Sequence, residues 1–116
     1  MKPKRMKQAK GAFKDFPTEC QIGGIKYDIR YVKSKGKGKG KIIGDDAGAI
    51  NQSEALIEIC ADLKPQVALV VLVHEMLHGV GDCMLPERSP FAKEGFTSIV
   101  SELLVQALRT SGLIKM

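Results

Sequence analysis

The chain has 116 residues, of which 44% are hydrophobic, and its formal net charge is +5. This length is typical of one domain, and the hydrophobic fraction is high enough for a packed core, which excludes a disordered chain. The longest apolar run, residues 67–73, is far shorter than the roughly 20 residues that a membrane-spanning helix needs. No apolar segment follows the basic N-terminus, and the three cysteines include no CxxC pair. We therefore expect one cytoplasmic domain without a disulfide framework.

Positive charge is concentrated in two segments. Residues 2–14 contain six lysines and arginines, and residues 33–41 read KSKGKGKGK. Basic stretches can bind nucleic acid through its phosphates, but both segments lack the aromatic residues that stack on bases. We expect residues 1–17 to form a flexible basic tail and residues 33–41 a mobile loop. Any nucleic-acid contact through them would be weak. Residues 18–116 would form the single folded domain.

Period-two patterns predict a small, mostly antiparallel sheet in the first half of the chain. Apolar and charged residues alternate from Ile25 to Tyr31, which predicts a strand with one buried face. Gly23 and Gly24 before it favour a tight turn from a short strand that contains Cys20.

Two more strands are predicted further along the chain. One spans residues 41–44 and the other residues 55–60, and a turn containing Asp45, Asp46 and Gly48 separates them. The segment ALIEIC at residues 55–60 is expected to form the exposed edge of the sheet.

Two helices complete the predicted α+β fold. Pro65 suits a first helical turn, and Gly79 or Gly81 is expected to end the helix that follows. This helix is apolar almost all round and should be central and buried. The last helix, residues 90–111, carries apolar residues at helical spacing and is followed by Gly112. We expect both helices to pack on one face of the sheet.

The central helix contains HEMLH, with the only histidines of the chain, His74 and His78. A spacing of four residues places both imidazoles on one helical face, where they can bind one zinc ion. Glu75 lies about 100° around the helix from His74, so its carboxylate lies beside the metal and can take a proton from zinc-bound water. Two buried histidines bonded to backbone groups are the structural alternative. Polar groups are costly to bury in an apolar helix without a purpose, and we favour the metal site.

A catalytic zinc site needs a third protein ligand and leaves one position open for water. Glu94 is the favoured ligand, because the small residues after it would let the last helix approach the metal closely. Glu102 and Glu87 are alternatives. Cys83 is a weaker candidate, and Asp82 could orient His78 through a hydrogen bond.

The segment ALIEICADLKPQVALVVLVHEMLHGV resembles the core of small zincin-type metallopeptidases of phages and prophages. These are compact gluzincin relatives, similar to minigluzincins and to the anti-repressor peptidases of phage immunity. The resemblance covers residues 20–112 and includes KEGFTSIVSELLVQALRTSGL as the closing helix. It implies His74, His78 and Glu94 as metal ligands and Glu75 as the catalytic base. Relatives often carry two acidic residues before the aromatic one, whereas this chain has Glu94-Gly95-Phe96, and the Gly/Lys loop has no counterpart.

The sequence therefore predicts a zinc-dependent metallopeptidase that acts on a peptide or protein substrate, in the host cytoplasm if a phage encodes it. The substrate would add to the sheet edge through main-chain hydrogen bonds. The alternative is a non-catalytic module in which zinc stabilises a small fold and the basic segments contact DNA or a host protein. The two hypotheses differ in the fourth coordination position, which an enzyme leaves to water and a structural site closes. The oligomeric state is not predicted.

Overall fold

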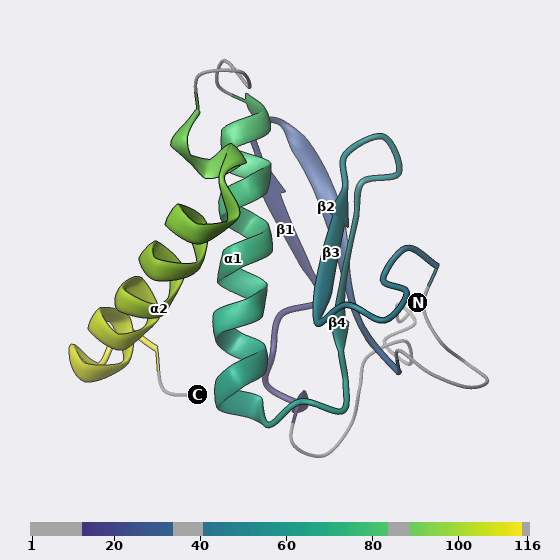
Figure 1. The fold of residues 1–116 in the computed structure, drawn as a ribbon. Helices are drawn as coiled ribbons and strands as arrows, with labels where there is room; N and C mark the ends of the chain where they lie inside the picture. The colour runs from purple at the N-terminus through teal and green to yellow at the C-terminus, as the bar shows by residue number, and fades with distance from the viewer. Residues whose placement is uncertain (1–12, 34–40, 84–88, 115–116) are drawn as a thin grey trace.

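The computed structural model describes residues 13–33, 41–83 and 89–114. The elements in chain order are β1 (Glu19–Ile22), β2 (Ile25–Val32), β3 (Gly48–Asn51), β4 (Leu56–Cys60), α1 (Pro65–Cys83), the 3₁₀ turn η4 (Pro90–Ala92) and α2 (Glu94–Thr110). A four-stranded sheet forms one layer, α1 covers one face of it, and α2 packs on the outer side of α1 (Figure 1). The predicted α+β class is confirmed, with both helices on the same side of the sheet. None of the helices that the structure describes has the length and apolarity that a membrane crossing requires.

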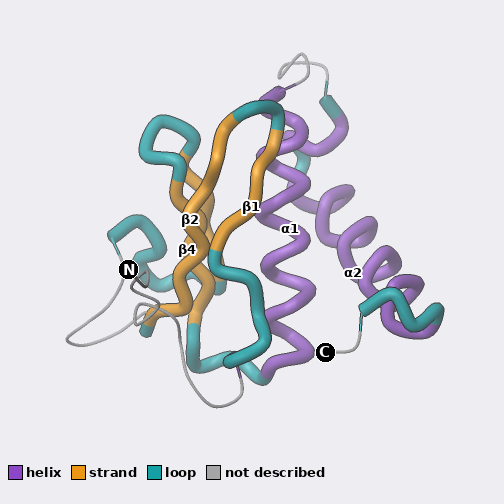
Figure 2. The backbone as a smooth tube through the Cα atoms, turned by 180° about the vertical axis from the view of Figure 1, so that it is seen from behind, coloured by secondary structure: helices purple, strands orange, loops and turns teal. Residues whose placement is uncertain are grey.

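The sheet has the strand order β1-β2-β4-β3. Two of its three pairings are antiparallel, β1 with β2 and β3 with β4, and the central pairing of β2 with β4 is parallel. The predicted hairpin is confirmed, and Figure 2 shows it from behind. Gly23 and Gly24 both have positive φ, as a type I′ turn requires, and this turn matches the twist of the two strands.

The strand β4 lies in the middle of the sheet, so the predicted edge position of ALIEIC is wrong. All five residues of β4 are buried. A strand that is covered on both faces reads as an almost continuous apolar run, which gives no sign of its position in the sheet. The edges are β1 and β3, and α1 packs directly on β3.

The predicted strand at residues 41–44 is also wrong, because the buried carboxylate of Glu58 holds this segment as a loop. The backbone N–H groups of Lys41, Ile42 and Ile43 donate to Glu58 over 2.8, 2.8 and 3.0 Å. These donors are therefore not available to a β-ladder. The strand of this region starts later, at Gly48, within the segment that was predicted to be a turn.

The main core lies between the sheet and α1, and its buried members are Phe13, Phe16, Tyr27, Ile29, Tyr31, Ile57, Ile59, Ala68, Leu69, Leu72 and Val105. The predicted tail boundary at residue 17 is too late in the chain. The Phe13 ring stacks on the Tyr31 ring, and the Tyr31 hydroxyl donates to the Pro17 carbonyl over 2.7 Å. The predicted flexibility of residues 1–12 and of the Gly/Lys loop at residues 34–40 concerns segments outside the described residues.

The helix α1 begins at Pro65 as predicted but continues through Gly79 and Gly81 to Cys83. Both glycines serve close packing. A Cβ atom on Gly79 would lie 3.0 Å from methyl carbons of Ile22 and Ile50. The helix therefore continues because the glycines make room for neighbours on both sides, and neither adopts the left-handed conformation of a helix stop.

The predicted last helix is divided into η4 and α2. Lys93, between them, has an extended backbone, so that α2 begins at Glu94. At the other end Gly112 has a φ of 86°, and the N–H groups of Gly112 and Leu113 donate to the carbonyls of Arg109 and Leu108. This is a Schellman motif, and it ends α2 as the glycine predicted.

Candidate metal centre

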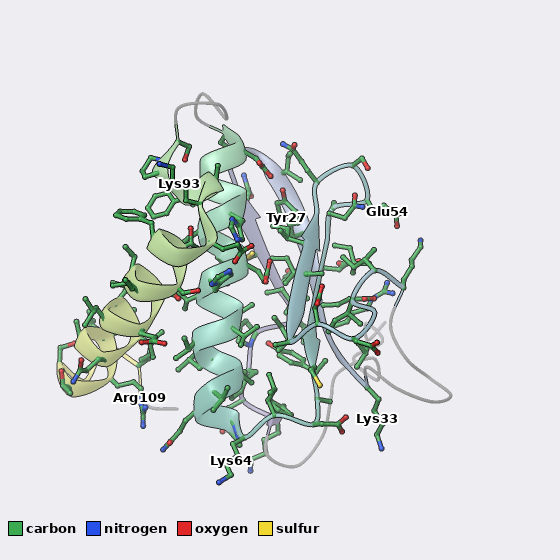
Figure 3. The ribbon with its side chains drawn as sticks, viewed as in Figure 1. Tyr27, Lys33, Glu54, Lys64, Lys93 and Arg109 are labelled. Carbon is green, nitrogen blue, oxygen red and sulfur yellow. The ribbon has the colours of Figure 1, made fainter. Side chains whose placement is uncertain are left out.

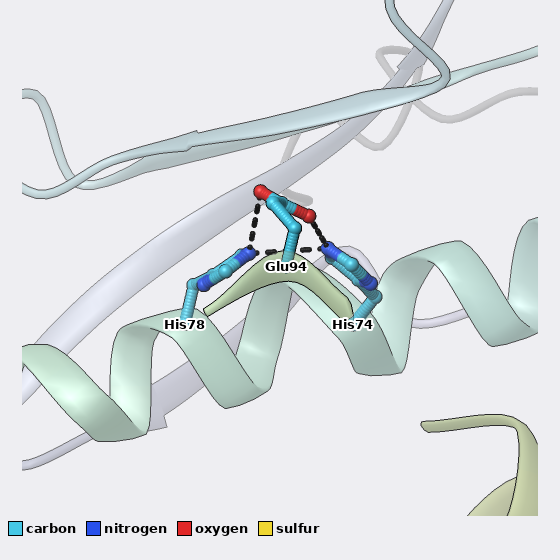
Figure 4. Close-up of side chains that lie close together, drawn as sticks. All are labelled: His74, His78 and Glu94. Carbon is cyan, nitrogen blue, oxygen red and sulfur yellow. Dashed lines mark hydrogen bonds and ion pairs between the residues drawn. The ribbon is translucent and has the colours of Figure 1, made fainter. Parts of the chain in front are cut away.

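Three polar side chains converge where the start of α2 crosses α1 (Figure 4). His74 and His78 project from the same face of α1, and Glu94 is the first residue of α2. The Glu94 carboxylate lies 2.8 Å from Nε2 of His74 and 3.1 Å from Nε2 of His78. One ligand atom of each residue lies within 4.8 Å of the other two, so the group is positioned to hold a metal ion.

The backbone fixes the tautomer of His78. A carbonyl oxygen only accepts hydrogen bonds, so Nδ1, 2.6 Å from the Phe91 carbonyl, carries a proton and donates it. When this imidazole is neutral, its lone pair is at Nε2, which faces the Glu94 carboxylate and, at 3.1 Å, Nε2 of His74. Two acceptors that face each other in this way repel unless a proton or a metal cation lies between them. The donor set therefore fits a metal ion. Asp82 was predicted to orient His78, but the Phe91 carbonyl has this role.

The seam between the helices is lined with small side chains, as the residues after Glu94 predicted. Thr97 and Ser101 are fully buried against α1. Ser98 Oγ of α2 lies 3.4 Å from Nδ1 of His74, the ring nitrogen that points away from Glu94. This leaves Nε2 of His74 directed at the cluster. Large side chains here would separate α2 from α1 and move Glu94 away from the histidines.

Gly81 allows the Phe91 carbonyl to lie close to His78. A Cβ atom on Gly81 would lie 2.8 Å from Ser89 Oγ and 3.1 Å from Phe91 Cβ. Ser89 Oγ in turn accepts from the Phe91 N–H over 3.1 Å and caps η4. The Phe91 carbonyl also accepts from the Thr97 hydroxyl over 3.2 Å. The absence of a side chain at residue 81 thus allows η4 to lie on α1 and its carbonyl to reach His78.

Glu75 lies beside the cluster, on the side of α1 that faces β3. Its side chain is buried, and its Cγ would lie 3.3 Å from a Cβ atom on Gly48. The pKa of this carboxyl is raised to about 7, mainly by burial; the nearby His78 acts to lower it, and Glu94 and Asp46 act to raise it. No described residue donates a hydrogen bond to this carboxylate. Glu75 is therefore a buried proton acceptor next to the two histidines.

The other predicted ligands do not join the cluster. Glu102 lies two turns further along α2, in a groove lined by Val70, Val105 and Ile114, among others. Cys83 lies at the end of α1 beside β1, with its sulfur 3.9 Å from the Ile22 carbonyl. Glu87 lies outside the described residues. Among the described candidates, Glu94 is the one that reaches both histidines.

Sequence reasoning missed the Phe91 carbonyl, Ser98 and the packing roles of Gly48 and Gly81. Backbone carbonyls carry no signal in a sequence. A glycine inside a helix, between His78 and a connection that contains prolines, can indicate that another segment packs closely there. This signal was missed because Gly81 was interpreted as a possible helix end. No family model matches the chain, and no curated protein or solved structure matches it either.

Proposed function

We propose that the chain is a zinc-dependent metallopeptidase. The observation that carries the proposal is the convergence of His74, His78 and Glu94, with the buried carboxylate of Glu75 next to them. Two imidazoles and one glutamate form a donor set known for catalytic zinc, in which three protein ligands leave the fourth position to water. The cluster has no fourth protein ligand among the described residues. A closed structural site would need one, which favours the enzyme over the zinc-stabilised binding module.

Glu75 is the general base in this proposal. Bound zinc would make a water molecule acidic and polarise the carbonyl of the scissile peptide bond. The Glu75 carboxylate takes the proton of the attacking water and passes it to the leaving amine. Its burial suits this role, because a carboxylate without hydrogen-bond donors is a better proton acceptor than one in water.

The edge strand β3 is the proposed place for the substrate backbone. The N–H of Cys60 donates to the carbonyl of Ala47, and hydrogen-bonded pairs alternate along an antiparallel ladder. In the register of β3 and β4, the N–H and C=O groups of Gly48 and Ile50 therefore point away from β4. An extended peptide can pair with these groups as an added strand. Gly48 also lies next to Glu75, so such a peptide would pass the catalytic base.

Metal analysis tests the ligand set. We expect purified protein that is reconstituted with zinc and desalted to contain close to one zinc ion per chain. His78→Ala and Glu94→Ala should lose most of it, and Glu102→Ala, the matched control on α2, should keep it. Zinc retained in Glu94→Ala would refute this ligand set. Absence of zinc from the reconstituted wild type would refute the metal centre.

Turnover tests the chemistry. Cleavage of a mixed peptide library, followed by mass spectrometry, should give products with the wild type and with Glu102→Gln. Glu75→Gln should keep its zinc and lose activity by a factor of about 10²–10⁴, the usual contribution of a general base. Equal activity of Glu75→Gln and wild type would refute the mechanism. Wild type that binds zinc but cleaves no peptide would favour the non-catalytic zinc-stabilised module.

A further inference from the structure

We infer that the outward face of α2 is an interface between two copies of this chain. The proposal does not depend on peptidase activity. It concerns the apolar stripe of α2, defined here as Phe96, Ile99, Val100, Leu103 and Ala107. These residues recur at intervals of three and four, so they lie along one side of the helix.

The apolar stripe faces away from the other elements that the structure describes. The side of α2 that packs on α1 carries the buried residues Thr97, Ser101 and Val105. Ile99 and Leu103 are 60% and 61% exposed, and Phe96 is 45% exposed. Figure 3 shows side chains projecting outward between the labelled Lys93 and Arg109. This is the reverse of the usual surface helix, which turns its apolar stripe to the core.

The metal centre explains the inner side of α2 but not the apolar stripe. Small residues are needed toward α1, because they let Glu94 approach the two histidines. The outer side has no such requirement and could be polar throughout. Several large apolar side chains at helical spacing on an exposed face are costly to solubility and are typical of a binding surface.

The exposed area is close to that of a modest dimer interface. With roughly 150–200 Å² for a whole large side chain, Phe96, Ile99, Leu103 and the flanking Leu104 leave about 300–400 Å² of apolar surface in water. A standard interface buries about 800 Å² per partner, of which about 60% is apolar. The outer face of α2 therefore supplies most of the apolar area that a dimer requires. Because the total lies at the lower end of the range, we expect a dissociation constant in the micromolar range.

The charge distribution favours a second copy as the partner. The apolar stripe contains no charged residue, and the charged residues of α2 are Glu94, Glu102 and Arg109, which lie on its other sides. A nucleic acid or an acidic protein would find no cation on this stripe to bind. An identical neutral stripe is complementary to it, and isologous pairing around a two-fold axis brings no like charges of the stripe together.

The spacing also suits an antiparallel pair of α2 helices. Leu103 lies near the middle of this 17-residue helix. If the two-fold axis passes beside Leu103, the two copies of this leucine meet, and Ile99 of each chain faces Ala107 of the other. Large side chains would then meet small ones, as close packing of two helices requires.

Sedimentation experiments on the full chain, with and without zinc, test the proposal. Wild type should show a reversible monomer–dimer equilibrium. Leu103→Glu should raise the dissociation constant at least about 30-fold, the effect of losing a central anchor. Because Leu103 is exposed, this variant should keep the circular dichroism, unfolding temperature and zinc content of the wild type. Val80→Glu is the matched control, because Val80 is an exposed valine of α1 outside the apolar stripe.

Three results would count against the proposal. One is a wild type that stays monomeric up to about 1 mM, where even a millimolar affinity would be detected. Another is a Leu103→Glu variant that dimerises as strongly as wild type, since the interface would then lie elsewhere. A dimer that is lost equally in Val80→Glu would also count against the apolar stripe. Loss of peptidase activity or of zinc binding alone would not affect this proposal.

Discussion

Two polar clusters lie in otherwise apolar segments, and they differ in their hydrogen-bond partners. Glu58 lies in the strand LIEIC, and its carboxylate accepts three backbone N–H groups of residues 41–43. The histidines lie in the helical segment VLVHEMLH, and Nε2 of each ring lies within 3.1 Å of the Glu94 carboxylate. The Glu58 cluster is satisfied by the chain itself. The histidine cluster is positioned to hold a metal ion.

This difference distinguishes a structural polar group from a candidate functional one. A buried carboxylate is tolerated when enough donors replace the water that it loses, and Glu58 then fixes a loop. Glu75, which is also buried and packs beside Gly48 of β3, receives no hydrogen bond from the described residues. A buried carboxylate without hydrogen-bond donors adds little to stability, which makes Glu75 a candidate for a functional role.

Replacement of the two glutamates should give unequal changes in stability. Glu58→Leu leaves three backbone N–H groups without their acceptor, and we expect a loss of about 3–5 kcal/mol in the free energy of unfolding. Glu75→Leu removes a buried carboxylate that has no donor, and we expect no loss or a slight gain. Urea unfolding of the metal-free proteins, followed by circular dichroism, measures both.

Glu58→Gln is the control for shape. Its amide keeps one oxygen, which can accept from Ile42 and Ile43, but its NH₂ group faces the N–H of Lys41. We expect a loss of about 1–2 kcal/mol, between those of wild type and Glu58→Leu. If Glu75→Leu costs as much as Glu58→Leu, the contrast between the two clusters is wrong.

Metal removal should destabilise the histidine cluster and leave the Glu58 cluster unchanged. At a free zinc concentration about 100 times the dissociation constant, binding adds about 2.7 kcal/mol to the folded state. For a domain of this size we expect the unfolding temperature to fall by about 10 °C when a chelator is added. Calorimetry with zinc and with chelator measures the shift, which Glu94→Ala should reduce and Glu102→Ala should not.

The same experiment on Glu58→Leu tests whether the clusters are independent. Its unfolding temperature should be lower in both conditions, but the shift between zinc and chelator should be that of the wild type, because distant sites contribute additively. An unfolding temperature that is equal with zinc and with chelator in the wild type would contradict the metal centre.

Local patterns in the sequence were sufficient to predict the hairpin and the helical face that carries the candidate metal centre. The alternation of Ile25 to Tyr31 and the Gly23-Gly24 turn are short-range signals, and the structure follows them. The spacing of His74 and His78 fixes their common face on any helix. Glu94 could be chosen because the residues after it are small, which is a property of the sequence.

Features that depend on distant partners could not be predicted in this way. KIIG was predicted to be a strand, because nothing near it shows that Glu58, many residues later, takes its N–H groups. ALIEIC was predicted to be an edge strand but lies inside the sheet. Its apolar run does not show which strands lie beside it. The periodicity of α2 defines an apolar side but does not show whether that side faces the core or the solvent.

Gly81 gives the smallest predicted effect and tests how the histidine cluster is held. Gly81→Ala should improve the intrinsic stability of α1, since alanine is favoured over glycine in helices by up to about 1 kcal/mol. Its Cβ would lie too close to Ser89 and Phe91, so η4 must move and the hydrogen bond from His78 to the Phe91 carbonyl weakens. Loss of such a supporting partner lowers metal affinity by about 10-fold or more. Competition with a chromophoric chelator measures the affinity.

Gly95→Ala is the matched control, because Gly95 is also a helical glycine, lies next to Glu94 and has open space where a Cβ would be. It should raise the unfolding temperature slightly and leave zinc affinity unchanged. If Gly81→Ala and Gly95→Ala bind zinc equally well, the close approach of η4 does not orient His78. The histidine cluster would then depend only on the three ligands. If Gly81→Ala binds zinc more weakly and Gly95→Ala does not, Gly81 supports metal affinity without a side chain of its own. It would do so by letting the backbone of η4 approach His78.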